Sequence, residues 1–477
     1  MYDIIIIGAG SGGLNIASFM NSIGLKVLLI DRSDAHIGGD CLNTGCVPSK
    51  ALIHVARMHK NAQEATAFGV RLGGSIDLEK VMAHVRGAQD VIREHESATY
   101  FRSKGMDVVF GEASFTSRDS VQVGGEVYRG KKIVIATGSR PRALTIPGTD
   151  EVEKSGRLYT NENIFTLNTL PKKLLVIGAG PIGIELGQAF RHLGSDVFIV
   201  TNDVQILPRE DCTLSSILFE RLTKDGVKFH FNKKTLRFEK GSLIVLEDIV
   251  THEETTIAFD AVLVSIGRVL NTESLALDKA GIAIDERGKI KVDAYLRTTN
   301  KNILVCGDVA GQHQFTHAAE LHAGVIIKNM LTPLFKKKLS TDALSWVTYT
   351  IPELATYGLG EADLKKRNVP FHVLESSFED DDRAITDDVR YGYTKMFVHT
   401  KTKQILGGTM IAPNAGELIQ ELIMATTSGL TTSAIFNKIY PYPTAGRINK
   451  RVVANGERGR LTPLVKRIMR LLYSLNG

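Results

Sequence analysis

Cys41 and Cys46 are the residues of this chain best suited to chemistry, because two thiols this close in sequence can form and break a disulfide. They lie in the segment GGDCLNTGCVPSK, residues 38–50, where Pro48 predicts a helix over residues 51–60. A thiolate near a helix N-terminus is stabilised by the helix dipole, which lowers its pKa. Two unrelated buried thiols are the alternative interpretation, and the rest of the chain decides between them.

The cysteine content favours a pair that cycles between thiols and a disulfide. The chain has 4 cysteines in 477 residues, and its apolar N-terminus contains Asp3 and several glycines, unlike a signal peptide. We therefore expect a cytoplasmic location, where a permanent structural disulfide is disfavoured. No apolar run approaches the roughly 20 residues that a membrane span needs.

The segment before the cysteines has the pattern of a nucleotide-binding strand, helix and strand. Residues 4–7 predict a strand, the turn GAGSGG and a helix follow, and a second strand over residues 27–30 ends at Asp31. The glycines of the turn are Gly8, Gly10 and Gly13. They let the backbone approach a pyrophosphate at the helix N-terminus, while Asp31 can hydrogen-bond a ribose diol.

The same pattern recurs over residues 174–200 and predicts a second nucleotide site. The glycines of this turn are Gly178, Gly180 and Gly183. Asp31 follows the first glycine of its turn by 23 residues, and the same offset here reaches Thr201 instead of an acid. An acid would favour NADH by repelling the 2′-phosphate of NADPH, so the choice between them stays open. The nearest downstream cation, Arg209, is too far along the chain to decide it.

Further motifs follow in order: IVIATG at residues 133–138, VSIGR at 264–268 and ILVCGD at 303–308. With the two nucleotide units and the cysteine pair, they make the whole chain resemble the class I pyridine nucleotide-disulfide oxidoreductases, in the dihydrolipoamide dehydrogenase and mercuric reductase-like group. The resemblance implies FAD and NAD(P)H as cofactors. The implied FAD contacts are Gly8, Gly10, Gly13, Asp31, Thr137, Gly138 and Asp308. The implied NAD(P) contacts are Gly178, Gly180, Gly183, Thr201, Gly267 and Arg268.

The resemblance also implies roles for individual side chains. Cys46 corresponds to the thiol beside the flavin, and Cys41 to the thiol that exchanges with the substrate. Lys50 corresponds to a lysine beside the flavin ring that pairs with a glutamate, here Glu185. No metal site is predicted.

The resemblance implies an α/β fold with two Rossmann-like domains, for FAD and NAD(P), and a C-terminal α+β dimerisation domain. Length and composition agree with several domains. The expected boundaries are 1–148 and 271–343 for FAD, 149–270 for NAD(P), 344–460 for the dimer interface and 461–477 for a basic tail. A homodimer is expected.

The chain departs from this family where the substrate is chosen. Disulfide reductases of this fold commonly carry a histidine near the C-terminus, with a glutamate five residues later, as a proton relay. Tyr442 and Arg447 stand at these positions, and a phenol is a poor base at neutral pH, although it can donate a hydrogen bond. The C-terminal cysteine pair of mercuric reductases is also missing, since the last cysteine is Cys306.

Basic residues gather at the C-terminus. The net charge is +6, yet residues 447–477 contain eight Lys or Arg and one Glu, so the rest of the chain is nearly neutral and no nucleic-acid surface is expected. The basic residues are Arg447, Lys450, Arg451, Arg458, Arg460, Lys466, Arg467 and Arg470. After Pro463 the apolar residues fall on one helical stripe, which predicts a helix that docks on the protein or its dimer mate, or else contacts a membrane or an acidic partner.

Three functional hypotheses follow. The first is an FAD-dependent reductase that passes two electrons from NAD(P)H through Cys41 and Cys46 to a small-molecule or protein-linked disulfide, or to another thiol-reactive acceptor. The second keeps the flavin but gives the electrons directly to a quinone, oxygen or a metal ion. The third is a redox-sensing flavoprotein that controls a partner.

Overall fold

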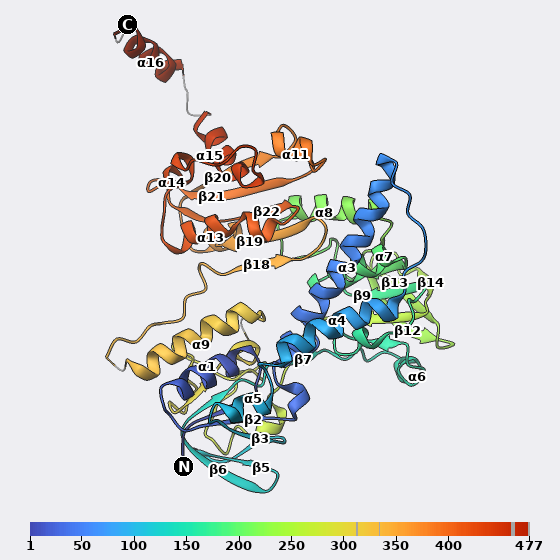
Figure 1. Ribbon diagram of the computed structural model, residues 1–477, viewed down its shortest axis with the longest axis vertical. Helices are drawn as coiled ribbons and strands as arrows, with labels where there is room; N and C mark the ends of the chain where they lie inside the picture. The colour runs from blue at the N-terminus through green and yellow to red at the C-terminus, as the bar shows by residue number, and fades with distance from the viewer. Residues whose placement is uncertain (312, 333, 459–462, 476–477) are drawn as a thin grey trace. The chain divides into compact units, whose positions relative to one another are not determined.

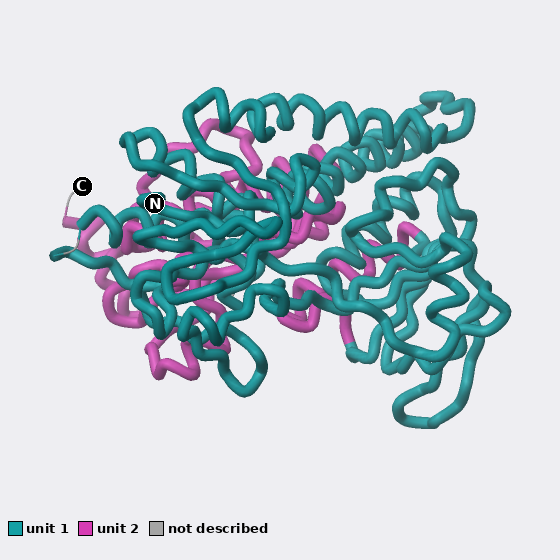
Figure 2. Tube along the Cα trace, turned by 90° about the horizontal axis from the view of Figure 1, so that it is seen from below, with its two compact units in different colours: residues 1–204, 226–339 teal, residues 205–225, 340–477 magenta. Residues whose placement is uncertain are grey.

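The computed structural model describes residues 1–311, 313–332, 334–458 and 463–475, and the chain divides into two compact units. Unit 1 contains residues 1–204 and 226–339, and unit 2 contains residues 205–225 and 340–477 (Figure 2). Four residues of the predicted basic tail lie outside the described residues, namely 461, 462, 476 and 477. Arg460, which precedes the tail, also lies outside them, as do the side chains of Glu457 and Arg458. The predicted domain boundaries stay predictions.

The first nucleotide unit forms the centre of a sheet with the strand order β3-β2-β1-β6-β5-β4, in which β17 also pairs with β6. The strands are β1 (Tyr2–Ile7), β2 (Val27–Asp31), β3 (Asp107–Phe110), β4 (Ser114–Ser117), β5 (Ser120–Val123), β6 (Glu126–Ile135) and β17 (Ile303–Val305). β1 is parallel to β2 and β6, and its residues 4–7 are buried, as expected for the interior of a parallel sheet. Helices α1 (Ser11–Ser22) and α9 (Thr316–Leu331) lie side by side (Figure 1).

The second nucleotide unit forms a separate sheet of unit 1 with the strand order β11-β10-β9-β15-β8. Its strands are β8 (Leu158–Tyr159), β9 (Lys173–Ile177), β10 (Asp196–Val200), β11 (Lys228–His230) and β15 (Ala261–Val264). Helix α7 (Pro181–Leu193) starts at a proline, whose missing N–H costs nothing in the first turn, and ends at Gly194 in the left-handed conformation. Strands β12 (Lys233–Glu239), β13 (Leu243–Asp248) and β14 (Glu254–Ala258) form an antiparallel sheet.

The cysteine motif forms two helices, α2 (Gly39–Asn43) and α3 (Cys46–Ala65). The prediction of a helix over residues 51–60 was wrong at its start, because the helix begins at Cys46 itself and Pro48 lies within its first turn. A proline is tolerated there since the first N–H groups of a helix have no intrahelical partner. α3 packs against α4 (Leu78–Arg93) and α7 (Figure 1).

Unit 2 contains an antiparallel sheet with the strand order β18-β19-β22-β21-β20. Its strands are β18 (Ser345–Thr348), β19 (Glu353–Gly358), β20 (Phe371–Ser377), β21 (Tyr393–His399) and β22 (Ile405–Ala412). Helix α8 (Cys212–Lys224) packs on β22, and α15 (Ile448–Arg458) packs on β20. The mixture of helices with an antiparallel sheet agrees with the predicted α+β character of this region.

Shorter elements complete the chain. Unit 1 also holds α5 (Ala98–Ser103), α6 (Thr149–Lys154), β7 (Ser139–Pro141) and β16 (Arg268–Leu270). Unit 2 also holds α10 (Glu361–Lys366), α11 (Asp382–Thr386), α12 (Ala415–Leu418), α13 (Gln420–Thr427), α14 (Thr432–Asn437) and α16 (Pro463–Leu475). Within the described ranges, none of the helices has both the length and the apolar character needed to cross a bilayer.

Candidate active site

Cys41 on α2 and Cys46 at the start of α3 interact through a hydrogen bond between their thiol groups. This bond and burial raise the pKa of Cys41, whereas the same bond lowers the pKa of Cys46 to about 6 against the opposing effect of burial. Lys50 lowers the pKa of Cys46 further by its charge. A reduced pair at neutral pH therefore holds one proton on Cys41 and a negative charge on Cys46.

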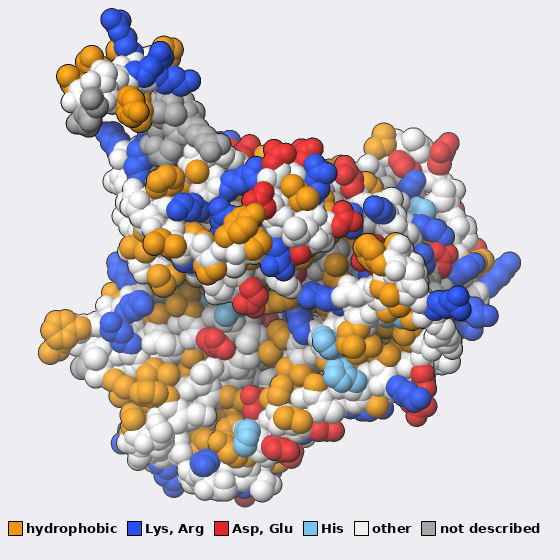
Figure 3. All heavy atoms as spheres, turned by 45° about the horizontal axis from the view of Figure 1, so that its top comes forward, with side chains coloured by type: hydrophobic (Ala, Val, Ile, Leu, Met, Phe, Trp, Pro, Cys, Tyr) orange, Lys and Arg blue, Asp and Glu red, His pale blue; other side chains and the backbone are white. Residues whose placement is uncertain are grey.

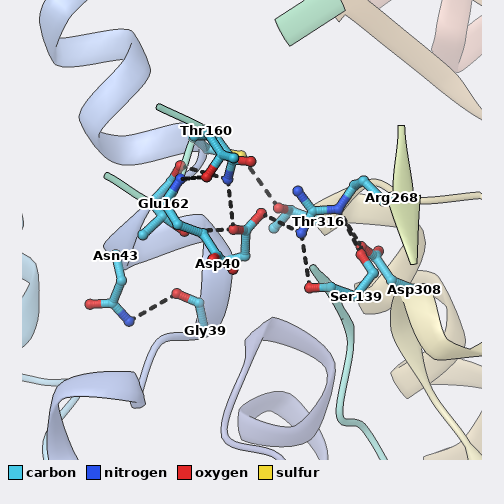
Figure 4. A network of polar contacts seen from close by, with 12 residues as sticks. Gly39, Asp40, Asn43, Ser139, Thr160, Glu162, Arg268, Asp308 and Thr316 are labelled. Carbon is cyan, nitrogen blue, oxygen red and sulfur yellow. Dashed lines mark hydrogen bonds and ion pairs between the residues drawn. The ribbon is translucent and has the colours of Figure 1, made fainter. Parts of the chain in front are cut away.

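Thr316 is a partner of Cys46 that the sequence analysis did not find. Its Oγ1 lies 3.5 Å from the Cys46 sulfur, and this contact lowers the pKa of Cys46 (Figure 4). Thr316 is the first residue of α9, and 270 positions separate it from Cys46. No local pattern around the cysteines could have indicated it.

Lys50 and Glu185 meet as the sequence analysis predicted. Lys50 Nζ lies 2.7 Å from Glu185 Oε2, and the Glu185 side chain is 8% exposed. The pair joins α3 to α7, so it connects the cysteine helix with the helix of the second nucleotide unit. A charge-assisted hydrogen bond of this kind holds the lysine in one orientation.

Two glycines of the first turn leave no room for a side chain. Gly8 has φ +107°, and a Cβ there would lie 2.3 Å from the Ala136 carbonyl oxygen; a Cβ on Gly13 would lie 2.0 Å from the Gly8 oxygen. A Cβ on Gly10 would lie 3.7 Å from the Gly39 Cα, which is an ordinary contact, whereas a Cβ on Gly39 would lie 2.7 Å from the Gly10 Cα. A diphosphate group needs this kind of bare, closely packed backbone at a helix N-terminus, so the turn fits the FAD implied by the sequence.

Asp31 ends β2 next to this turn. Its carboxylate accepts a hydrogen bond from the Ala9 N–H at 2.6 Å and another from the Arg32 N–H, also at 2.6 Å. These bonds hold the acid at the end of the second strand, where a ribose hydroxyl can be recognised.

A polar network joins the cysteine motif to the segment that carries Asp308 (Figure 4). Arg268 Nη2 lies 3.2 Å from Asp40 Oδ2, and Arg268 Nε donates to Ser139 Oγ at 2.7 Å. Ser139 Oγ in turn donates to Asp308 Oδ2 at 2.6 Å. Burial raises the pKa of Asp308, against the effects of the Ser139 hydrogen bond and the Arg268 charge. Arg268, predicted to contact NAD(P), thus lies beside Asp308, which was predicted to contact FAD.

Three further predicted residues, Thr137, Gly138 and Gly267, form hydrogen bonds with backbone groups of other segments. Thr137 Oγ1 donates to the Asn271 carbonyl at 2.6 Å, and the Asn271 N–H donates to the Gly138 carbonyl at 3.1 Å. The Gly267 carbonyl accepts from the Arg142 N–H at 2.9 Å. Asn271 was not predicted, although it lies three residues after the VSIGR motif.

The second glycine turn repeats the geometry of the first. Gly178 has φ +108°, a Cβ there would lie 2.5 Å from the Ser265 carbonyl oxygen, and a Cβ on Gly183 would lie 2.2 Å from the Gly178 oxygen. A Cβ on Gly180 would meet nothing within 4 Å, so that position is open. This turn too can admit a diphosphate group.

An acid, Asp203, lies in the loop three residues after the end of β10. Thr201 Oγ1 donates to Asp203 Oδ2 at 3.1 Å, and the Asp203 N–H donates back to Thr201 Oγ1 at 3.1 Å. The sequence analysis missed Asp203 because it tested a single offset from the glycine turn, and the acid follows two residues later. The matched position remains Thr201, so the preference for NADH or NADPH stays open.

Glu96 is a further acid near the cysteine motif that was not predicted. Its Oε2 lies 2.6 Å from the position that a Cβ on Gly38 would take, and its charge raises the pKa of Cys41. The side chain is half-buried, and burial raises the pKa of Glu96, with an opposing effect from Arg93. It follows α4, which ends at Arg93.

Tyr442 lies in unit 2 before α15 and is 68% exposed. The guanidinium of Arg447 lies over its ring, 4.9 Å from the centroid. The structure thus brings together the two residues that replace the expected histidine and glutamate. Among the described residues, no group of three or more His, Cys, Asp or Glu could hold a metal ion.

Comparison with known proteins agrees with this fold and site. Residues 2–323 match the family model of the pyridine nucleotide-disulphide oxidoreductases, and residues 344–451 match the dimerisation domain of the same family. The chain therefore belongs to the pyridine nucleotide-disulphide oxidoreductase family. It is an FAD-dependent oxidoreductase of the NAD(P)H-linked, sulfur-directed class, and the dimerisation domain supports the predicted homodimer.

Individual relatives cover nearly the whole chain. A dihydrolipoyl dehydrogenase of Chlamydia muridarum is 34% identical, over 94% of this chain and 95% of the relative. A mercuric reductase of Staphylococcus aureus is 31% identical, over 93% of this chain and 80% of the relative. The solved Cu(II) complex of the HOCl-induced flavoprotein disulfide reductase RclA from Escherichia coli superposes with a TM-score of 0.82 at 27% identity, covering 95% of this chain and 99% of that one.

Proposed function

We propose that this enzyme reduces a disulfide with NADH, using Cys46 as the thiol that receives electrons from FAD and Cys41 as the thiol that exchanges with the substrate. When bound, FAD accepts two electrons from the reduced nicotinamide and delivers them to a disulfide. The observation that carries the proposal is the surroundings of Cys46 at the start of α3: its sulfur lies 3.5 Å from Thr316 Oγ1, Cys41 is its thiol partner, and Lys50, paired with Glu185 at 2.7 Å, favours its charged form.

The exchange uses the proton on Cys41 and the charge on Cys46 in two steps. Cys41 passes its proton to the Cys46 thiolate and attacks one sulfur of the acceptor disulfide as a thiolate, which forms a mixed disulfide and breaks the acceptor's S–S bond. The departing thiolate takes the proton from Cys46 and leaves as a thiol, so that Cys46 is a thiolate again. The Cys46 thiolate then attacks the Cys41 sulfur, which closes the Cys41–Cys46 disulfide and releases the second thiol, protonated from solvent. Two electrons and two protons have then passed to the acceptor, and the disulfide is ready to be reduced again.

The remaining predicted residues hold the cofactors and the charges. The first glycine turn and Asp31 would bind the diphosphate and ribose of FAD, with Thr137, Gly138 and Asp308 along the rest of the molecule. Lys50, fixed by Glu185, stabilises the negative charge on Cys46. Arg268 positions Asp40 and Asp308 by the contacts described above, so we assign it to the FAD side of the site.

The preference for NADH rests on Thr201 and Asp203. A carboxylate at the end of the second strand accepts hydrogen bonds from a free ribose diol and repels a 2′-phosphate. Asp203 lies three residues beyond that end and is held by two hydrogen bonds with Thr201. Asp203→Asn should raise the KM for NADH and lower the ratio of kcat/KM for NADH to kcat/KM for NADPH. Equal kcat/KM values for the two nucleotides in the wild type would contradict this assignment.

The acceptor is proposed to be a disulfide other than lipoamide. A missing acid/base group typically costs a factor of about 10² to 10⁴, and Tyr442 with Arg447 replaces the relay of dihydrolipoamide dehydrogenases. A metal ion is the second candidate, because the similar RclA structure is a Cu(II) complex and relatives include a mercuric reductase. The cytoplasmic location stays a prediction.

The test is steady-state turnover of the FAD-loaded protein. We expect NAD⁺ reduction by dihydrolipoamide to be hundreds of times slower than in a competent dehydrogenase, while NADH reduces small disulfides and Cys41→Ser abolishes that activity. Cys212→Ser is the matched control, because Cys212 is an exposed thiol in unit 2 and should not affect turnover. If Cys41→Ser kept wild-type turnover with every acceptor, the flavin would have to reduce the acceptor directly, and the proposal would be refuted.

A further inference from the structure

The C-terminal helix α16 (Pro463–Leu475) has two chemically distinct faces. At 3.6 residues per turn, its apolar side chains share one continuous side, and Lys466, Arg467, Arg470 and Ser474 share the other. The apolar side chains are Leu464, Val465, Ile468, Met469, Leu471, Leu472 and Leu475. The helix contains no acidic residue, so its side chains carry a charge of +3.

This apolar side is exposed in the described chain. Leu464 is 66% exposed, Leu472 56% and Leu475 74%, and none of the residues of α16 is buried (Figure 3). Helix α4 is amphipathic too, but it buries the apolar residues Leu78, Val81, Met82 and Val85 against the protein. The apolar side of α16 is therefore not used to build the core of unit 2, in contrast to the usual role of such a stripe.

The family's own interface does not account for the helix. The match to the dimerisation domain ends at residue 451, twelve positions before α16 begins. The chemistry of the helix instead matches a lipid surface. On the helical wheel, Lys466 borders the apolar side at one edge, next to Tyr473, and Arg467 borders it at the other.

Cations at the edges of an apolar side can reach lipid phosphates while their stems stay on the apolar surface, and tyrosine is common at this depth. Thirteen residues at about 1.5 Å each give about 20 Å, which is too short to span a hydrocarbon core of about 30 Å. A helix of this kind lies in the plane of the interface.

We infer that α16 anchors the enzyme peripherally to an anionic lipid bilayer, with its apolar side in the interface and its cations toward the phosphates. The inference does not depend on the proposed acceptor, because it concerns residues outside the family match.

The test is flotation of the FAD-loaded full-length protein with vesicles. We expect it to float with vesicles of phosphatidylcholine and phosphatidylglycerol, much less with phosphatidylcholine alone, and less at high salt, since screening weakens the attraction. A chain that ends at residue 462 should not float. Failure of the full-length protein to float with the anionic vesicles would overturn the inference.

Two matched substitutions separate insertion from charge attraction. Ile468→Glu and Ser474→Glu change the net charge equally, but only the first lies on the apolar side. One charge near an anionic surface is worth about 1 kcal/mol, so Ser474→Glu should lower binding about fivefold. Ile468→Glu also loses the burial of an apolar side chain and should lower binding at least about fiftyfold.

Other outcomes refute the inference. Equal losses in the two variants would mean that the charges alone attract the helix without insertion. A change of oligomeric state in Ile468→Glu, measured by light scattering, with vesicle binding intact, would mean that the apolar side is a contact between chains. Both variants should keep wild-type NADH-dependent turnover, because neither residue belongs to the catalytic site.

Discussion

Cys46 should titrate in the reduced protein with a pKa of about 6, below the ordinary value of 9.0. The hydrogen bond from Cys41 is the largest cause, and Thr316 and Lys50 act in the same direction against burial and Asp40. Because the pKa is lowered, the thiolate is present above about pH 6 and is lost as the pH falls through that value. Any step that needs the Cys46 thiolate loses its rate over the same pH range.

Thr316→Val removes one of these causes and leaves the thiol pair in place. A hydrogen bond to a charged group contributes about 1.5–3 kcal/mol, and sulfur is a weak acceptor, so we take the low end, which corresponds to a pKa rise of about 1. Starting from a pKa of about 6, the thiolate fraction at pH 6.5 should fall from about three quarters to about one quarter. Thr316→Ser keeps the hydroxyl and should titrate like the wild type.

The assay is the ultraviolet absorbance of the thiolate in the reduced protein, followed across pH. Subtracting the same protein with both Cys41→Ser and Cys46→Ser removes the contributions of the flavin, Cys212 and Cys306, and Cys41 itself titrates at higher pH because its pKa is raised. An unchanged midpoint in Thr316→Val would refute the role of this contact. A wild-type midpoint near that of an ordinary cysteine would refute the proton and charge division on which the proposed mechanism rests.

Three further predictions concern neighbouring side chains. Lys50→Met should lower the unfolding free energy in urea by about 1–2 kcal/mol, because a charge-assisted hydrogen bond to a nearly buried carboxylate is lost; a double-mutant cycle with Glu185→Gln should show that the two effects are coupled. Glu96→Gln should raise the free energy of unfolding at pH values above the raised pKa of Glu96, because burial destabilises only the ionised carboxylate. At acid pH, where Glu96 is protonated, the variant and the wild type should be equally stable, and a difference that does not change with pH would contradict this. Tyr442→Phe should lower kcat/KM for the disulfide about tenfold if the hydroxyl donates a hydrogen bond in the transition state, with NADH reduction of the flavin unchanged as control.

The glycine turns could be predicted from sequence because the spacing of their glycines is a short pattern that occurs twice. Gly8 and Gly178 have positive φ values, which glycine adopts readily, whereas the backbone that crowds them, at Ala136 and Ser265, belongs to segments far along the chain. The strands beside them are runs of Ile, Leu and Val that a parallel sheet buries. The order of such units along the chain then restricts the fold to one family.

The partners that tune the cysteines could not be predicted in this way. Thr316 reaches Cys46 across 270 residues, and Arg268 on β16 reaches Asp40 on α2. Such contacts depend on how distant segments pack, which no periodicity records. Asp203 is a milder case, because it lies only two residues after Thr201, and its hydrogen bonds with Thr201 became visible only in the structure.

The start of helix α3 was also not predicted correctly from the sequence. A proline rule places the helix after Pro48, but the structure starts it at Cys46. The difference matters for function, because Cys46 then occupies the first turn, where the free N–H groups and the helix dipole act on its sulfur. A start at residue 51 would have placed the thiolate outside that turn.

The described structure separates the chemistry of electron transfer from the choice of acceptor. The groups that set the charge on Cys46, namely Cys41, Thr316, Lys50 and Asp40, all belong to unit 1. Tyr442, which stands where the family places its relay, belongs to unit 2 and carries a cation over its ring instead of an adjacent carboxylate. We therefore expect substitutions at Tyr442 to leave the pKa of Cys46 unchanged even where they change the rate of disulfide turnover.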